Sequence, residues 1–102
     1  MILEKNNFYA FFETTQIAKI KEIFENAGWN SSKASWYGFE LSNNWSELIL
    51  EPYESEILLN GAVMFNPENV EALDLVFAKT GAGFKYEFYD DDHNLLLEKK
   101  SP

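Results

Sequence analysis

The sequence contains no cysteine, no arginine and only one histidine. Without cysteine the chain has no disulfide, no thiolate nucleophile and no cysteine-based metal site. Without arginine it lacks the side chain that most often binds phosphates and base edges through two hydrogen bonds. His93 alone falls short of the several nitrogen or sulfur ligands that an ordinary zinc site needs. We therefore expect no metal and no cofactor.

Positive charge is also scarce, with 8 basic residues against 17 acidic ones and a formal net charge of −9 at pH 7. Proteins that bind nucleic acid present basic surfaces, so this balance excludes a nucleic-acid partner.

Long apolar runs are missing as well. Residues 1–3 are apolar, but Glu4 follows at once, so that neither a signal peptide nor a membrane span is expected. A cytoplasmic location is the expectation.

The composition itself is that of a globular chain, since 46% of the 102 residues are hydrophobic and 25% are charged. This length is close to that of one domain. The sequence shows no linker, no internal repeat and no low-complexity segment. We expect residues 1–102 to form a single domain.

Two segments have the periodicity of helices. Apolar residues at helical spacing predict a first helix at about 15–27, with Thr14 or Thr15 as its N-cap. Residues 66–68 (Asn-Pro-Glu) combine an N-cap, a proline at the first helical position and an acid in the first turn. They predict a second helix, which Gly81 ends.

Alternating apolar and polar residues predict six strands. The first is dense in aromatic residues and has apolar side chains on both faces, which is typical of a central strand. Residues 29–33 are predicted to be a polar loop, Pro52 to end a strand, and Gly61 to mark a bulge or a close backbone approach. Residues 98–102 are expected to fray. The six predicted strands are 8–12, 35–42, 46–51, 56–65, 84–89 and 95–98.

The resulting order is β-α-β-β-β-α-β-β, an α+β pattern. Three consecutive strands between the helices imply antiparallel hairpins. Each helix has one apolar stripe, so both helices are expected on one face of a mostly antiparallel sheet, with the other face left to solvent or a partner. The residues expected to form the core are Phe39, Leu48, Leu59, Leu73, Phe77 and Tyr86.

Segment 90–94 (Asp-Asp-Asp-His-Asn) is the first candidate for chemistry. Asp90, Asp92 and Asn94 have the 1-3-5 spacing of a calcium loop. Leu95 stands where that loop needs glycine, and Ser101 stands where it needs a closing glutamate. The segment therefore predicts a solvated hairpin turn. No nucleophile elbow, phosphate loop or deep pair of acids is present, so we expect no enzymatic activity.

The charge pattern is more informative. No basic residue occurs between Lys33 and Lys79, and the acids of that stretch fall mainly on the predicted middle strands. By alternation they share a face with Trp36, Ile49 and Tyr89, which is what a basic protein partner would bind. An ordinary solvated face of an acidic protein explains the same pattern. The candidate partner-binding residues are Trp36, Glu40, Glu47, Ile49, Glu51, Glu54, Glu87 and Tyr89.

This layout resembles that of bacterial immunity proteins, the inhibitors paired with toxin nucleases in contact-dependent inhibition and polymorphic toxin systems. The features are the helix 17–27, the acidic strands 36–56 and the ending 84–90 (Phe-Lys-Tyr-Glu-Phe-Tyr-Asp). The resemblance covers the whole chain and depends on layout and charge, with no specific motif. It implies that the protein binds a basic toxin domain and blocks its active site.

Three other functions remain open at this point. A phage-type inhibitor that mimics DNA, such as an anti-CRISPR protein, would carry carboxylates spaced like phosphates along a strip. A structural or regulatory subunit would complete a homodimer through the open sheet face. A small enzyme would use Asp90, Asp92 and His93.

Overall fold

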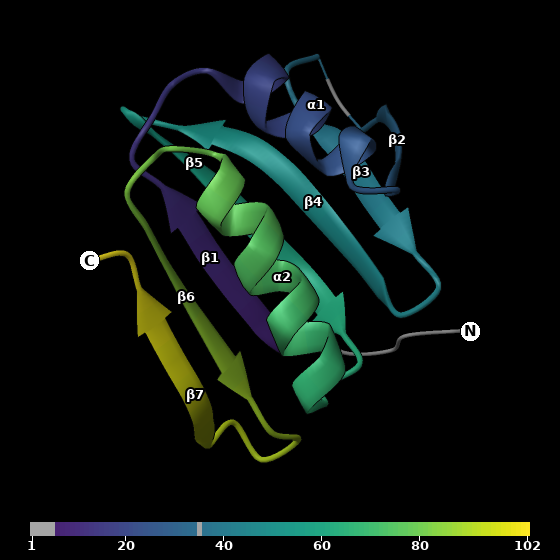
Figure 1. Cartoon of the computed structure of the whole chain (residues 1–102), viewed down its shortest axis with the longest axis vertical. Coiled ribbons are helices and arrows are strands. Elements are labelled where there is room, and N and C mark those ends of the chain that lie inside the picture. Colours follow the sequence, from purple (N-terminus) through teal and green to yellow (C-terminus); the bar gives the residue numbers. More distant parts are fainter. Residues whose placement is uncertain (1–5, 35) are drawn as a thin grey trace.

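Seven strands and two helices make up the described residues, 6–34 and 36–102, of a computed structural model of the chain (Figure 1). The elements are β1 (Phe8–Phe12), α1 (Ile17–Asn26), β2 (Asn30–Lys33), β3 (Phe39–Asn43), β4 (Ser46–Tyr53), β5 (Glu56–Val63), α2 (Pro67–Lys79), β6 (Phe84–Tyr89) and β7 (Leu95–Lys100). Among the described helices, neither has the length and apolar character needed to cross a membrane.

The strands form one antiparallel sheet in the order β2-β3-β4-β5-β1-β6-β7. The aromatic strand β1 is central, and Phe8 pairs with Gly61 of β5 on one side and Phe88 of β6 on the other. Both helices lie in front of the sheet in Figure 1, on the same face. The predicted α+β class, with two helices on one face of an antiparallel sheet, is confirmed.

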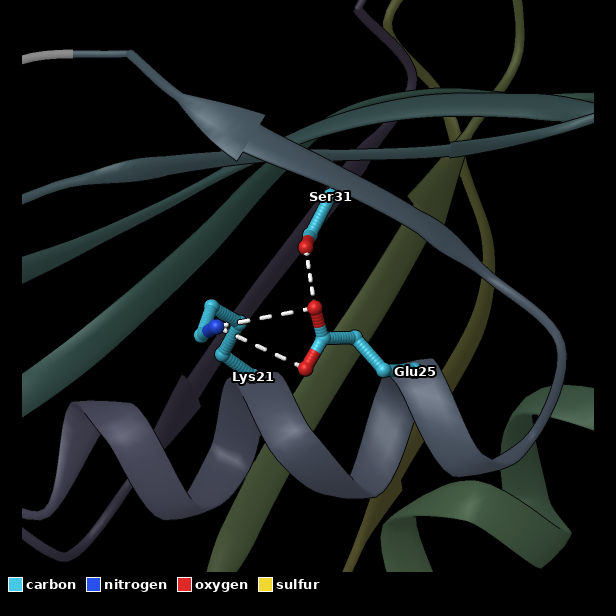
Figure 2. A network of polar contacts seen from close by, with 3 residues as sticks. All are labelled: Lys21, Glu25 and Ser31. Carbon is cyan, nitrogen blue, oxygen red and sulfur yellow. Dashed lines mark hydrogen bonds and ion pairs between the residues drawn. The ribbon is translucent and has the colours of Figure 1, made fainter.

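The prediction of a polar loop at 29–33 is wrong, because Asn30–Lys33 forms the edge strand β2 against β3. Its side chains are mostly exposed, so the strand lacks the apolar alternation by which strands are found in a sequence. Polar contacts attach β2 to α1 instead. Figure 2 shows Ser31 donating a hydrogen bond to the Glu25 carboxylate of α1, which Lys21 also contacts at 3.4 Å.

Four strands also differ from the predictions in their boundaries, and one of them, β5, ends at Val63 and not at residue 65. β3 begins at Phe39; Ser35 lies outside the described residues, and the chain bends at 36–37. β4 runs through Pro52 to Tyr53, where β3 no longer flanks it and a proline is tolerated. Residues 98–101 do not fray. β7 continues to Lys100, and the Ser101 N–H then donates to the Phe84 carbonyl at 2.9 Å.

The two helices begin differently. In α1 the N-cap is Gln16, with no side-chain cap, so the prediction of Thr14 or Thr15 is wrong. The Thr14 hydroxyl instead accepts a hydrogen bond from the Gln16 N–H at 3.3 Å, in the turn before the helix. In α2 the predicted cap is confirmed, since Asn66 Oδ1 accepts from the Asn69 N–H at 2.8 Å.

The core lies between the sheet and the helices, and the Phe77 ring of α2 is at its centre. This ring packs on Phe12 with centroids 4.7 Å apart and on Tyr86 at 5.4 Å. Five of the six predicted core residues are buried. Phe39 is only partly buried, because it starts β3 near the margin of the sheet, where the Lys21 ammonium lies 5.2 Å from its ring centre.

Gly61 lies where two backbones meet. A Cβ at this position would collide with the Glu47 carbonyl oxygen of β4 and lie 2.9 Å from the Leu48 Cα. The predicted close backbone approach is therefore present, and it keeps β4 and β5 tightly paired along their whole length.

Candidate functional site

The face of the sheet opposite the helices is covered by no other described element, and we call it the open face. Strand alternation determines which side chains it carries, because residues on either side of a buried core residue point to the other face. On β4, for example, Leu48 and Leu50 are buried, whereas Glu47, Ile49 and Glu51 are exposed. The far side of the sheet in Figure 1 is this face.

Cross-strand pairing arranges the open face in rows. The middle row runs through Glu40, Ile49, Asn60, Tyr9 and Glu87, each directly opposite the next. A second row runs through Glu51, Leu58, Phe11, Lys85 and Lys100. Each row thus begins with an acid on β3 or β4, continues through neutral or apolar side chains to β1, and is charged again at β6 or β7.

The eight candidate residues fall in three places on the structure. Four of them lie together on β3 and β4, namely Glu40, Glu47, Ile49 and Glu51. Glu87 and Tyr89 lie on β6, which β5 and β1 separate from β4.

Glu54 and Trp36 lie outside the sheet face. Glu54 is in the β4–β5 turn with a positive φ of 55°. Trp36 was expected on a strand, but it lies in the β2–β3 connection with 90% of its surface exposed. The predicted placement of Trp36 by strand alternation is wrong, because the strand begins three residues later.

Five carboxylates on β3, β4, β5 and the β4–β5 turn form no ion pair among the described residues. We call these five the acidic half, of which Glu54 lies in the turn at the edge of the open face and the other four lie on it: Glu40, Glu47, Glu51, Glu54 and Glu56. The ion pairs among the described residues are Lys21–Glu25, Lys85–Glu98 and Lys99–Asp74, and none of them involves the acidic half. The opposite half, at β6 and β7, contains Lys85 paired with Glu98 at 3.3 Å. Negative charge is therefore concentrated at one side of the face.

The centre of the open face is apolar, and the residues that form it are not among the eight candidates. Tyr9, Phe11 and Leu58 lie side by side on β1 and β5, and Tyr9 is 38% exposed. The signal for these residues was present in the sequence, since the first strand has apolar side chains on both faces. The second apolar face of β1 is the middle of the open face.

Three hollows lie along the middle row. The largest, of about 390 Å³, is lined by side chains that include Glu40, Glu47 and Asn60. The next, of about 160 Å³, is lined by Asn60, Tyr9 and Glu87 among others. The third, of about 270 Å³, is lined by Tyr9, Tyr89 and His93. Adjacent hollows share Asn60 or Tyr9, and we call the three together the transverse groove.

Hydrogen bonding fixes the β6 end of this groove. The Tyr89 hydroxyl donates to Glu87 Oε2 at 3.0 Å, and the Tyr9 ring packs edge-on against Tyr89 at 5.7 Å between centroids. The hydrogen bond to Glu87 raises the pKa of the Tyr89 phenol above its ordinary value. The Tyr89 side chain is thus joined to both Glu87 and Tyr9 at this end of the groove.

In the acidic turn 90–94, the Asp90 carboxylate binds backbone N–H groups of the turn itself. Asp90 Oδ1 accepts hydrogen bonds from the Asn94 N–H at 2.8 Å and the Asp92 N–H at 2.9 Å. The bond from Asn94 is the main cause of a lowered Asp90 pKa. Among the described residues, no three His, Cys, Asp or Glu side chains converge to hold a metal ion.

Comparison of the chain with family models, with curated proteins and with solved structures found no match. The chemistry and the geometry of the open face are therefore the basis for assigning a function.

Proposed function

We propose that this chain is a non-enzymatic binding protein that neutralises a basic protein by covering its active site with the open face. This is the action that the resemblance to bacterial immunity proteins implies. The observation that carries the proposal is a sheet face that no described helix or strand covers, with an apolar centre and with flanking carboxylates that form no ion pair among the same residues.

The acidic half supplies the long-range part of such an interaction. Five carboxylates on one side of the face create a negative potential that speeds the encounter with a basic surface. Lysine would weaken this potential, and the acidic half has none of its own. The net charge of −9 acts in the same direction.

The apolar centre supplies the short-range part. The lifetime of a complex depends on buried aromatic and aliphatic anchors at the centre of its interface, and charged residues are enriched at the rim. Tyr9, Phe11, Leu58 and Ile49 occupy the central position on this face. A partner that covers them also brings its basic groups against Glu40, Glu47 and Glu51.

A nuclease is the partner class that this face fits best. The active site of a nuclease binds a polyanion and is therefore surrounded by positive charge. A protein that covers this site with carboxylates competes with the substrate for the same charges. Inhibition by occlusion then needs no catalytic group in the inhibitor.

Two of the alternatives fit the face less well. Dimerisation through the open face would bring together two copies that each carry a net charge of −9, and their like charges repel. A DNA mimic needs an uninterrupted strip of carboxylates, but Ile49, Asn60 and Tyr9 interrupt the middle row between Glu40 and Glu87.

The proposal is tested with the protein encoded beside the gene for this chain, which the proposal predicts to carry a basic nuclease domain. We expect one equivalent of the chain to abolish nuclease activity and Glu47→Lys with Glu51→Lys to abolish the inhibition. Glu22→Lys with Glu71→Lys is the matched control, because these exposed acids lie on the two helices and change the net charge equally. No inhibition by the parent chain, or equal loss in both variants, would contradict the proposal.

A further inference from the structure

The largest hollow of the transverse groove has the lining of a site for a cationic side chain. Glu40 of β3 and Glu47 of β4 supply two carboxylates, and Ser42 and Asn60 add neutral oxygen acceptors. Among the residues that the structure describes, none that lines the hollow is basic. A guanidinium or an ammonium group carries several hydrogen-bond donors and no acceptor, which is the complement of this lining.

The size and the apolar wall of the hollow match one long side chain. Its volume of about 390 Å³ lies near the lower end of ligand pockets, so it has room for a side chain and the backbone that carries it. Ile49, 36% exposed, forms part of the wall. Lysine and arginine bury their aliphatic stems against such surfaces while the charged head finds its partners.

The rest of the groove sets the direction of the segment that carries this side chain. From Glu40 to Glu87 the middle row crosses four strand spacings, about 19 Å. An extended segment rises about 3.3 Å per residue, so about six residues span this distance. Along the way Tyr9 offers an aromatic face, and at the far end Glu87 offers a third carboxylate.

We infer that the transverse groove binds an extended basic segment of the partner protein, with one arginine or lysine side chain inserted between Glu40 and Glu47. The inference rests on the proposed function and adds the mode of recognition to it. Charge complementarity identifies the occupant as a basic segment. A second copy of this chain has a net charge of −9 and would therefore be repelled by the same surface.

The experiment uses the full chain and a ten-residue peptide of alternating arginine and threonine, with a peptide of citrulline and threonine as its neutral match. In amide-resolved NMR we expect the arginine peptide to shift the signals of residues 47–49, Asn60 and Tyr9. Citrulline keeps the shape of arginine and lacks the charge, so its peptide should bind about tenfold more weakly or not at all.

Two variants with the same change in net charge locate the binding site. Glu40→Gln with Glu47→Gln removes the carboxylates of the hollow, and we expect the Kd for the arginine peptide to rise about tenfold. Glu51→Gln with Glu54→Gln removes two carboxylates of the acidic half that do not line the hollow, and we expect a change of less than about twofold. Unchanged amide spectra away from the substitutions show that both variants fold.

Failure of this inference differs from failure of the proposed function. If both double variants bound the arginine peptide equally weakly, binding would depend on general electrostatics. This result would overturn the inference that one side chain inserts between Glu40 and Glu47. Shifts confined to β7 or to the Trp36 connection would also overturn it. Inhibition of the nuclease domain without any binding of the arginine peptide would overturn only the inference that the groove binds a basic segment. If neither inhibition nor peptide binding occurred, the proposed function would be overturned as well.

Discussion

At the scale of single residues, the buried aromatic and aliphatic side chains determine stability. Leu73 and Phe77 of α2 are fully buried, and α2 joins the sheet through them. The polar groups beneath this helix are also matched, since Tyr86 donates to Asp74, which binds the Lys99 ammonium at 2.7 Å. Both kinds of contact lead to a measurable prediction.

Leu73→Ala should lower the free energy of unfolding by about 2–5 kcal/mol, because the substitution removes buried surface and leaves a cavity. Leu75→Ala is the control on the same helix. Leu75 is 62% exposed, so its removal should cost less than about 0.5 kcal/mol. Urea unfolding of the two variants measures the difference, and equal midpoints would contradict the helix packing.

Tyr86→Phe tests the buried phenol. Burial, and then the hydrogen bond to Asp74, raise the pKa of Tyr86 far above its ordinary value of 10.0. A group with a raised folded pKa stabilises the protein fully below its unfolded pKa and loses that effect as the pH rises further. The parent chain should therefore be more stable than Tyr86→Phe up to about pH 10 and lose this advantage above it. An advantage that stays constant to pH 11 in chemical unfolding would contradict this prediction.

At the scale of elements, the sequence predicted every strand and helix that carries apolar residues, and it missed β2, which has none. The helix at Asn66-Pro67 and the strands at Leu48 and Leu59 carry apolar periodicity and were predicted correctly. β2 has no buried face, so that its strand character comes only from pairing with β3 and from contacts with α1.

The contact between α1 and β2 gives a prediction at this scale. The Ser31 hydroxyl is the main cause of the lowered pKa of Glu25, and Lys21 lowers it further. Ser31→Ala should therefore raise the Glu25 pKa towards its ordinary value of 4.5. The stabilising effect of this carboxylate, present above its unfolded pKa, should then fade at a higher pH as the solution is acidified.

NMR titration of the Glu25 side-chain carboxyl carbon measures this change directly. Ser32→Ala is the control, because the Ser32 hydroxyl donates to Glu40 and leaves Glu25 untouched. An unchanged Glu25 pKa in Ser31→Ala would show that the network drawn in Figure 2 does not hold β2 to the helix.

At the scale of the whole molecule, the open face results from strand order. The sequence predicted that both helices cover one face, but it could not place β1 between β5 and β6, since that pairing joins residues about fifty to eighty positions apart. The order brings Tyr9 and Phe11 to the centre of the face. It also separates Glu87 and Tyr89 from the acidic half, which local alternation could not show.

This arrangement predicts two kinds of kinetic effect on binding to the basic partner. Glu51→Lys with Glu54→Lys should slow association steeply at low salt and less at high salt, because these carboxylates act at long range. Trp36→Ala should leave association nearly unchanged and shorten the lifetime of the complex, with a loss of about 2 kcal/mol, because a desolvated aromatic side chain mainly slows dissociation. Stopped-flow association and dissociation rates at two salt concentrations measure both effects.

The substitution of Trp36 has a simple control. The side chain is 90% exposed, so the variant should unfold at the same urea concentration as the parent chain. If both folded variants bind the partner with parental rates, the acidic half and the Trp36 connection are not part of the interface.

The central claim is that the open face contacts the partner, and methyl cross-saturation NMR of the complex tests it most directly. With the chain labelled at its methyl groups and the partner protonated, irradiation of the partner reduces only the signals of methyl groups at the interface. We predict reduced signals for Ile49 and Leu58 of the open face and an unchanged signal for Leu75 on α2. A reduced Leu75 signal with unchanged signals from Ile49 and Leu58 would contradict the claim.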